Sequence, residues 1–503
     1  MSHIYINAEP EGVVLDVLIK NKTHFKRTVL PKLKLDLFYD KSDWPEEPML
    51  ISEKSELYIS GWFIFNDKKN DLYGFKKFLD ENINYCLENK DFTSLTQYID
   101  TGVFIAVYIN NGNVYIISDP FALSNHYYSL NDNVKIAPYP SALGESIDSD
   151  LNDFLHQQGH LFGKYTAYKE VFRFLPNDLI LFDSKNFEIY TSNYDIEPVD
   201  LKNENVYLEI KKTISHWNDE EISLALSAGF DSRLIASVCS PYYTYTWGPS
   251  SSLDQKIAKK IALLKSSHHL SFLFKSIPIK NEDKCFCEAV FSGVVKDYNS
   301  QFFANYKYVN SLTKQSHVAL DGYLGDVLQR GVYLYPVGIK GEFVKIFPSM
   351  LIKTSSPKEI LRTRYKKVDD NLFSLLYEDF LSKTENLNSI DDYNKVTYYE
   401  FVYGRGLRYI TTGAVVMNSI FKTVVPCFAN KKIFSALINN HASRVANYTV
   451  FSEVWSDIKE PYKSYISEGF YSPSTNRIMI PIFNFFGRLI TNKVRHFQNY
   501  TKE

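Results

Sequence analysis

The chain has 503 residues and a formal net charge of −2 at pH 7. Its length accommodates two or three domains, and its near-neutral charge gives no reason to expect nucleic acid or an anionic membrane as the main partner. The five cysteines follow no framework spacing, which predicts unpaired, buried thiols in a reducing compartment, so the cytoplasm is the expected location. The sequence shows no signal-peptide pattern and no apolar run of about 18 residues or more, so we expect no membrane span.

Residues 1–200 read mainly as strands. Runs of β-branched and aromatic residues predict strands over 55–65, 102–109 and 114–118, and an Asn-Asn-Gly-Asn turn joins the last two into a hairpin. Further hairpins are predicted around 131–133 and within 179–190. Many strands with few helices predict a layered antiparallel-sheet domain.

The pattern changes near residue 200, where a polar stretch suggests a domain boundary. Beyond it, strands alternate with longer helical segments, which is the rhythm of a parallel α/β sheet. Helices dominate from about residue 357 onward. The predicted elements are a helix over 207–215, a strand over 222–226, a helix over 232–238, a strand over 242–247 and a helix over 253–264.

The most informative stretch joins the strand over 222–226 to the next helix through a turn of small residues. The unpaired N–H groups and the positive dipole end of a helix start make an anion site. Ala228 fits such a turn only if its φ is negative. Asp231 would be out of place beside a phosphate unless it holds a cation, and Mg²⁺ supplies that reason. An ordinary strand–turn–helix is the alternative. The residues expected to contact the nucleotide here are Leu226, Ser227, Ala228, Gly229, Asp231 and Ser232.

This loop resembles the Ser-Gly-Gly-x-Asp-Ser loop of the ATP pyrophosphatases, which bind ATP and cleave it between the α and β phosphates. It is no Walker loop, because no Gly-Lys-Ser/Thr follows. Ala228 stands where that family usually has glycine, and Arg233 where it often has serine. We expect Arg233 either to donate to the pyrophosphate or to point into solvent.

Two later segments resemble the asparagine synthetases. Residues 243–262 look like their second strand and helix, which places Trp247 and Gly248 beneath the adenine. Residues 317–331 look like their strand followed by a Gly-x-Gly-x-Asp-Glu loop, so the resemblance implies that Asp326 shares Mg²⁺ with the loop aspartate.

The second of these segments also departs from the family pattern, with Leu324 and Val327 in place of a usual glycine and glutamate. Asp321 and Gly322 are expected at the nucleotide. Tyr323 falls where the related β-lactam synthetases carry a catalytic tyrosine, and mere packing is an equal alternative.

The C-terminal part of the sequence gives weaker signals. Residues 424–430 resemble an Arg-x-Pro-Phe-Leu-Asp segment in which Asn430 replaces the aspartate. The family also has a lysine that stabilises developing charge; Lys463 is the candidate, with Lys459 behind it, and a solvated surface lysine is the alternative. The apolar stretch 478–490 is expected to be a core segment, with packing on a partner or a membrane surface as the other reading.

The N-terminal domain also resembles the amidotransferase part of this family, an Ntn-hydrolase-like fold, through residues 102–108, 118–128 and 166–178. Glutaminase activity there needs a cysteine exposed after removal of the first methionine, acting as nucleophile with its own amine as base. Here the residue is Ser2, and Ser60-Gly61 stands where an oxyanion Asn-Gly pair is usual. Ser2 as a replacement nucleophile is the alternative, since related hydrolases use serine. We therefore expect a degenerate glutamine-amidotransferase-like domain over 1–200 and an asparagine-synthetase-like ATP-binding domain over 201–503.

The resemblance implies an AMP-forming, ATP-dependent carbon–nitrogen ligase that uses ATP and Mg²⁺ to adenylate a small-molecule or peptide carboxylate. The amine is either ammonia or an amine on the substrate itself, as in β-lactam synthetases and lasso-peptide cyclases, and amidation of a sugar acid is a further option. The departures leave a degenerate ATP-binding or scaffold protein as the alternative. A tRNA-modifying enzyme would show a basic face or paired cysteines, and neither appears. A homodimer is left open.

Overall fold

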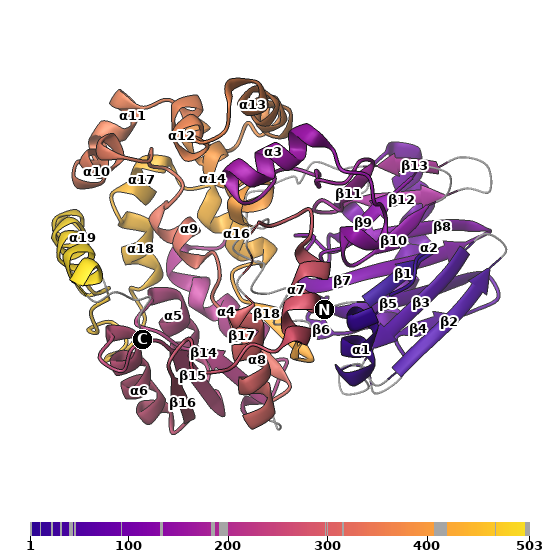
Figure 1. Ribbon diagram of the computed structural model, residues 1–503, viewed down its shortest axis with the longest axis horizontal. Coiled ribbons are helices and arrows are strands. Elements are labelled where there is room, and N and C mark those ends of the chain that lie inside the picture. The colour runs from indigo at the N-terminus through magenta and orange to yellow at the C-terminus, as the bar shows by residue number, and fades with distance from the viewer. Residues whose placement is uncertain are drawn as a thin grey trace. The chain divides into compact units, whose positions relative to one another are not determined.

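The computed structural model describes residues 3–10, 12–21, 24–30, 33–39, 44, 47–91, 93–130, 134–182, 187–190, 200–296, 298, 300–313, 316–406, 420–467 and 469–497 (Figure 1). The chain divides into two compact units. One comprises Met1–Asp195, Ile279–Tyr306 and Val402–Val425, and the other Ile196–Pro278, Lys307–Phe401 and Pro426–Glu503. Two segments from the second half of the sequence thus belong to the first unit. The boundary near residue 200 between independent domains stays a prediction.

The first unit contains two antiparallel sheets. Within its described residues, one sheet has the strand order β11-β9-β10-β1-β3-β2, and the other has the order β13-β12-β8-β7-β5-β4, with β6 paired to β5. The strands are β1 His3–Ile6, β2 His24–Leu30, β3 Leu33–Tyr39, β4 Met49–Ile51, β5 Ser55–Phe65, β6 Lys68–Lys69, β7 Ile99–Asn110, β8 Asn113–Ser118, β9 Tyr127–Ser129, β10 Lys135–Ala137, β11 Val171–Arg173, β12 Leu179–Phe182 and β13 Phe187–Tyr190.

The predicted hairpins are present in this unit. β7 pairs with β8 across a turn in which Asn111 and Gly112 both have positive φ, as a tight hairpin turn requires. β9 pairs with β10, and β12 with β13. The residues 131–133 and 183–186 that join these pairs lie outside the described part of the chain. The antiparallel layered architecture expected from the sequence is therefore confirmed.

The core of the first unit lies around β5. This strand contacts β1 and β3 of the other sheet and also α2, so it is buried along nearly its whole length. Residues of both sheets and of α2 share one hydrophobic cluster. The helices assigned to this unit are α1 Gly12–Asn21, α2 Leu72–Asn89, η1 Thr93–Thr96, η2 Pro140–Ala142, α3 Ser149–Gln158 and α7 Asn281–Phe291, and α8 Gln301–Leu312 begins in it.

The second unit is built on a sheet in which β16, β15, β14 and β17 follow one another in that order among the described residues. The pairs of β14 with β15, of β15 with β16 and of β14 with β17 are parallel, as the alternating pattern predicted. β14 and β17 are almost entirely buried, which is typical of strands covered on both faces. These strands are β14 Ile222–Ala225, β15 Tyr243–Trp247, β16 His268–Phe272 and β17 Val318–Asp321. A further strand, β18 Thr423–Pro426, consists mostly of residues that are grouped with the first unit.

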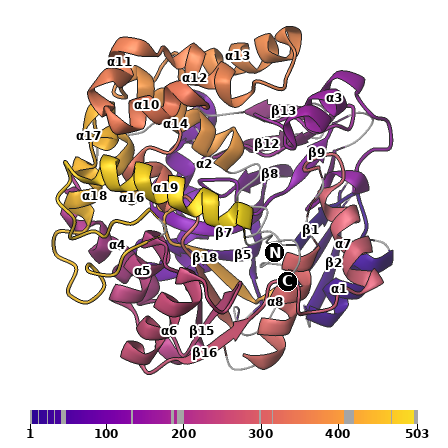
Figure 2. The ribbon, with the colours of Figure 1, turned by 60° about the vertical axis from the view of Figure 1, so that its left-hand side comes forward.

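Helices surround this sheet and continue beyond it. α5 contacts β14, and α6 contacts β15 and β16 (Figure 2). None of the described helices combines the length and the apolar character needed to cross a bilayer. The helices are η3 Asn203–Asn205, α4 Val206–Ile214, η4 Asp219–Glu221, α5 Phe230–Val238, α6 Leu253–Lys265, α9 Gly325–Arg330, α10 Ile339–Ile346, η5 Pro348–Met350, α11 Leu351–Thr354, α12 Pro357–Arg364, α13 Asp370–Thr384, α14 Asp392–Val402, α16 Lys431–Ile438, α17 Ala442–Ala446, α18 Thr449–Val454 and α19 Ile480–Phe497.

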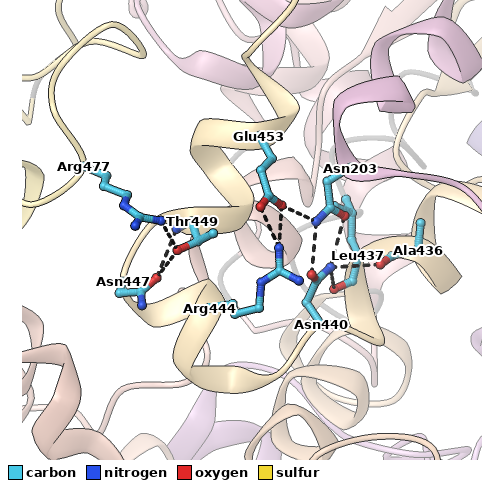
Figure 3. Close-up of polar contacts among 9 residues, drawn as sticks. All are labelled: Asn203, Ala436, Leu437, Asn440, Arg444, Asn447, Thr449, Glu453 and Arg477. Carbon is cyan, nitrogen blue, oxygen red and sulfur yellow. Dashed lines mark hydrogen bonds and ion pairs between the residues drawn. The ribbon is translucent and has the colours of Figure 1, made fainter.

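A polar network ties the start of this unit to its later helices (Figure 3). Asn203 in η3 donates to Asn440 Oδ1 at 3.0 Å and to Glu453 Oε2 at 2.8 Å. Asn440 returns a hydrogen bond to Asn203 and caps the carbonyls of Ala436 and Leu437 at the end of α16. The network fixes η3, α16 and α18 against one another.

The strand order places three loops at one edge of the sheet. β15 and β16 lie on one side of β14, and β17 lies on the other. The chain thus reverses its direction across the sheet between β14 and β17, and such a switch point at the carboxyl ends of parallel strands is the usual location of a ligand site. The loops that follow β14, β15 and β17 meet at this edge.

Candidate functional site

Two serine hydroxyl groups close the turn between β14 and α5. Ser232 Oγ accepts a hydrogen bond from the Ser227 N–H and lies 3.3 Å from Ser227 Oγ. Ser227 Oγ accepts the Gly229 N–H at 3.0 Å. Leu226 is buried and donates its N–H to the Tyr245 carbonyl, which fixes the turn to β15. These contacts hold the loop against the start of the helix.

The N-terminus of α5 is open to an anion. The helix begins at Phe230, and its N-cap residue Gly229 provides no side-chain acceptor. First-turn N–H groups that lack an intrahelical partner, together with the helix dipole, favour a negative ligand. A Cβ on Gly229 would lie 2.9 Å from Ser227 Oγ, so a side chain at this position would displace the Ser227 hydroxyl. Binding of phosphate here stays a prediction.

Ala228, the first departure from the glycine-rich pattern, fits the turn. The residue is fully buried, and its φ lies outside the positive range, so alanine is tolerated without backbone strain. Its N–H donates to Asp254 Oδ1 at 2.8 Å. A carboxylate from the first turn of α6 therefore already occupies one amide of the loop. Sequence reasoning missed Asp254, although an acidic residue two positions after the helix-capping Ser252 was a usable signal.

Asp231 and Asp326 are brought together from the first turns of two helices, α5 and α9. Asp231 Oδ2 accepts the backbone N–H of Asp326 at 3.1 Å, and its Oδ1 lies 3.4 Å from Gln329 Nε2, which donates to it. Burial, followed by the negative charge of Asp326, raises the pKa of the Asp231 carboxyl to about 7. A cation at this position would favour the ionised carboxylate. Gln329 was not singled out from the sequence.

Two glycines let the loop after β17 approach α5 this closely. A Cβ on Gly325 would lie 2.6 Å from Asp231 Oδ1 and 2.6 Å from the ring of Phe428. A Cβ on Gly322 would lie 3.2 Å from the Ser232 backbone nitrogen. The glycines of this segment are therefore explained by contact with the first turn of α5, and Gly322 lies beside the loop as expected.

Arg330 brings a positive charge to the same pair. Its Nη2 lies 3.6 Å from Asp326 Oδ2, and its side chain is 24% exposed. The guanidinium also lies 5.1 Å from the centroid of the Phe230 ring and donates to the Tyr471 hydroxyl at 3.3 Å. Sequence reasoning missed Arg330, which lies four residues after Asp326 on α9, a spacing at which opposite charges meet on a helix.

Of the two expectations for Arg233, the solvent-exposed one is wrong, and donation to the pyrophosphate stays a prediction. Its side chain is fully buried, so it does not point into solvent. It donates to the Gly229, Tyr462 and Tyr465 carbonyls, and it lies 4.7 Å from the Phe230 ring centroid. Burial lowers the pKa of its guanidinium to about 10. Through Nε and Nη1, Arg233 therefore links the loop to residues 462–465, while its Nη2 donates to none of the described residues.

Asp321, at the end of β17, is a second buried carboxyl. Its Oδ1 accepts the Tyr323 N–H at 2.9 Å, while its Oδ2 accepts no hydrogen bond from the described residues. Burial raises its pKa to about 8, although backbone amides of Tyr323 and Gly322 act in the opposite direction. The side chain is therefore mostly protonated at neutral pH and available as a donor to a polar ligand.

The rest of this loop is unusual in its backbone. Leu324 has a φ of +71°, a region that disfavours a branched side chain, and its side chain is buried. The glycine that the family usually has here would adopt this conformation freely. Val327 is buried as well, so it acts as a core residue where the family has glutamate. Tyr323 is half-buried, and its catalytic role stays a prediction.

Trp247 and Gly248 lie at the end of β15, at the same sheet edge. The Trp247 ring packs near Tyr245, Phe272 and Phe274, with centroids 5.8 to 6.4 Å apart. Gly248 has a φ of +138°, which requires glycine, and its N–H donates to the Phe272 carbonyl. This arrangement provides a rigid aromatic wall, and contact with adenine stays a prediction.

The C-terminal candidates, Lys463 and Asn430, have polar groups that are already engaged in contacts within the protein. Lys463 Nζ donates to the Ser456 carbonyl, so its amine is engaged locally. Its segment nevertheless lies against α5, because Arg233 holds the Tyr462 and Tyr465 carbonyls on either side of it. Asn430, the residue in place of the family aspartate, caps α16 by accepting the N–H groups of its first turn.

The polar groups expected near a glutaminase site have structural partners. Ser2 lies outside the described residues. Ser60 Oγ accepts the His3 N–H at 2.7 Å and donates to the Phe38 carbonyl at 3.4 Å. The Gly61 carbonyl accepts the indole N–H of Trp44. All five cysteines are unpaired, as predicted, and four are buried, while Cys285 is partly exposed, contrary to the expectation that all five are buried.

The donor set at the sheet edge is compatible with Mg²⁺. Within the described residues, no group of three or more His, Cys, Asp or Glu side chains could hold a metal ion. Mg²⁺ is commonly held by one or two carboxylates, with water and substrate phosphate completing its shell. The pair of Asp231 and Asp326 supplies two carboxylates, and Asp231 Oδ2 lies 3.1 Å from the Asp326 backbone nitrogen.

Comparison with known proteins gives distant matches only. No family model matches the chain, and no curated protein matches it. Among solved structures, the chain is similar to an NH3-dependent NAD synthetase from Campylobacter jejuni, at 14% identity and a TM-score of 0.19, over 45% of this chain and 94% of that one. It is similar to a glutamine phosphoribosylpyrophosphate amidotransferase from B. subtilis complexed with ADP and GMP, at 8% identity and a TM-score of 0.25, over 74% and 94%.

A third match is an allosteric regulatory enzyme of purine biosynthesis, at 8% identity and a TM-score of 0.22, over 62% of this chain and 88% of that one. Because these TM-scores are low, the case for a function rests on the residues of this chain.

Proposed function

We propose that this chain is an ATP-dependent, AMP-forming carbon–nitrogen ligase of the asparagine synthase type, whose first unit is a degenerate amidotransferase-like domain. The observation that carries the proposal is the meeting of three features at one sheet edge. These are the open N-terminus of α5, the hydroxyl groups of Ser227 and Ser232, and the carboxylates of Asp231 and Asp326. Anion-binding amides beside paired carboxylates suit a magnesium–phosphate ligand.

The proposed reaction has two steps. A carboxylate oxygen of the substrate attacks the α-phosphorus of ATP, the bond to the β-phosphate breaks, and pyrophosphate leaves. An amine then attacks the acyl carbon, and AMP leaves with the electron pair of the broken bond. The first-turn amides of α5 would bind the phosphates, Trp247 and Gly248 would adjoin the adenine, and the Asp321–Gly322 turn would contact the nucleotide. Asp321, mostly protonated at neutral pH, would donate a hydrogen bond there.

Asp231 and Asp326 would hold Mg²⁺, which neutralises the charge that develops on the leaving pyrophosphate. Tyr323 and Lys463 are the candidates for contact with the reacting groups. The role of Lys463 requires its amine to leave the Ser456 carbonyl, and that of Tyr323 is supported by its place on the loop that carries Asp326. The acceptor carboxylate is a small molecule or a peptide, and the amine comes from ammonia or from the substrate.

A second function, an ATP-binding or scaffold protein without catalysis, is favoured by two particular contacts. Asp254 occupies the Ala228 amide. Arg330 already lies beside Asp326, where a cation would otherwise be required. A nucleotide could then bind without productive placement of its phosphates.

The deciding experiment measures pyrophosphate release from ATP and Mg²⁺ by the full chain, with a panel of carboxylates and either ammonia or glutamine. Asp231→Asn keeps an acceptor for the Asp326 N–H but removes the charge, and we expect release to fall by about a hundredfold or more. Asp370→Asn is the matched control, since Asp370 also lies in the first turn of a helix of the second unit and is 93% exposed.

Release that depends on a carboxylate, falls in Asp231→Asn and persists in Asp370→Asn supports the ligase. Wild-type release by Asp231→Asn would refute the proposed metal role. If calorimetry detects magnesium-dependent ATP binding but no carboxylate supports release, the non-catalytic function replaces the ligase. Use of glutamine in place of ammonia would contradict the degenerate first unit.

A further inference from the structure

Exposed apolar side chains gather on two helices of the second unit. On α10 and just after it, Ile339, Phe343 and Phe347 are 92%, 47% and 51% exposed, and on α19 and just before it, Ile478, Phe486 and Ile490 are 74%, 56% and 48% exposed. The two helices pack against each other and lie side by side in both views (Figures 1 and 2). We call these six residues the α10–α19 face.

The apolar side chains of α19 do not form the core segment that the sequence predicted. Ile480 is buried, but Ile478, Ile482, Phe486 and Ile490 recur every four residues and are 39% to 74% exposed. Four-residue spacing places side chains on one stripe of a helix. The helix is therefore amphipathic, with its apolar stripe directed to solvent.

The other side of α19 is anchored to the unit. Gly487 lies against the backbone of Gly469, where a Cβ would approach Gly469 O to 2.7 Å. Asn484 donates to the Tyr448 hydroxyl at 3.1 Å, and Arg477, just before the helix, donates to Thr449 Oγ1 at 2.9 Å (Figure 3). Because Gly487 and Asn484 make these contacts of α19 with its unit, the apolar stripe of the helix remains available to bind another surface.

The charge of the segment indicates what that surface is. Residues 477–497 include Arg477, Arg488, Lys493 and Arg495 and no aspartate or glutamate, in a chain whose net charge is −2. A basic amphipathic helix with exposed Phe and Ile is the type that lies in the headgroup region of anionic bilayers. A two-fold contact between copies of the chain would bring this basic helix against itself without an acidic partner on it.

We propose that the α10–α19 face is a peripheral membrane-binding surface that takes anionic phospholipid headgroups and inserts its Ile and Phe side chains among them. The composition of the whole chain hides this property, because the basic excess is local. The proposal is independent of the ligase activity, since it uses none of the residues at the sheet edge.

The test is cosedimentation of the full chain, without ATP, with vesicles of phosphatidylcholine and phosphatidylglycerol and with vesicles of phosphatidylcholine alone. We expect binding to the anionic vesicles that weakens as salt is raised, and little binding to the neutral ones. The double variant Phe486→Glu/Ile490→Glu should bind at least about tenfold more weakly. Leu263→Glu, at a residue on α6 that is 72% exposed, should bind like the wild type.

A separate variant, Ile339→Glu, tests the α10 side of the face and should also weaken binding, with unchanged near-UV circular dichroism as evidence of folding. Failure of the wild type to bind anionic vesicles overturns the proposal, as does equal loss in Leu263→Glu. Light scattering measures the oligomeric state and so tests whether a second copy of the chain covers the face. A dimer that Phe486→Glu/Ile490→Glu dissociates, in a chain that ignores vesicles, would assign the face to a second copy.

Discussion

The sheet edge of the second unit and the Ser60–Gly61 stretch of β5 both gather buried polar groups, but they satisfy them differently. At the sheet edge, Asp231 and Asp321 have raised pKa values, and Asp321 Oδ2 accepts no hydrogen bond from the described residues. On β5, the Ser60 hydroxyl and the Gly61 carbonyl are both engaged by their own unit. Buried polar groups left incompletely paired are costly, so we infer that those at the sheet edge contact a ligand, while the paired groups of β5 suit a scaffold.

The largest expected effect comes from Asp321. Its folded pKa of about 8 lies above the value near 4 of an unfolded aspartate, so the folded state binds the extra proton between these pH values. Its contribution to stability is therefore present at low pH and is lost as pH rises through about 8. Asp321→Asn removes this dependence while keeping an acceptor for the Tyr323 N–H.

The measurement compares the free energy of unfolding of the wild type and Asp321→Asn by urea titration between pH 5 and pH 9. Over this pH range linkage sets an upper limit of about 4 kcal/mol on the change in their difference, with the variant gaining relative to the wild type as pH rises. If the free energies of unfolding of the two proteins change in parallel with pH, the Asp321 carboxyl is ionised or solvated in the folded state. The sheet edge and β5 would then differ less in how they satisfy their polar groups.

The second expected effect concerns how closely the two loops approach. Gly325→Ala places a methyl group 2.6 Å from Asp231 Oδ1 and from the Phe428 ring, and should destabilise the protein by about 1–3 kcal/mol. Gly322→Ala, whose nearest contact is 3.2 Å, is the matched variant and should cost less than about 1 kcal/mol. Thermal unfolding measures both, and equal costs would mean that the loop after β17 can move away from α5.

The comparison also shows what the sequence could predict. Small residues after a buried strand, with Asp231 and Ser232 following, were enough to predict a strand–turn–helix, and the alternation of strands and helices was enough to predict the parallel sheet, because those features depend on local chemistry. Asp254, Gln329 and Arg330 were missed, since their roles arise only when separate loops meet.

Arg233 and the α19 stripe show the opposite failure, in which a local reading gave the wrong environment. The solvated alternative for Arg233 is wrong, because its side chain is buried and residues 462–465, more than 200 positions away, supply carbonyl partners for it. The apolar residues of 478–490 looked like core, but glycine and asparagine make the contacts of α19 with its unit. Periodicity indicates that a helix has an apolar stripe but not which surface covers it.

The smallest expected effect concerns Ser60 on β5, where the polar groups are paired within their own unit. Ser60→Ala removes the acceptor of the His3 N–H and one buried donor, so it should destabilise the protein by about 1 kcal/mol. It should leave pyrophosphate release unchanged, because the hydroxyl serves the packing of β1 on β5. Thermal unfolding and the pyrophosphate assay together separate these effects. A loss of pyrophosphate release without a loss of stability would mean that the Ser60 hydroxyl takes part in the reaction. Full pairing of a buried polar group would then no longer distinguish a structural residue from a site residue.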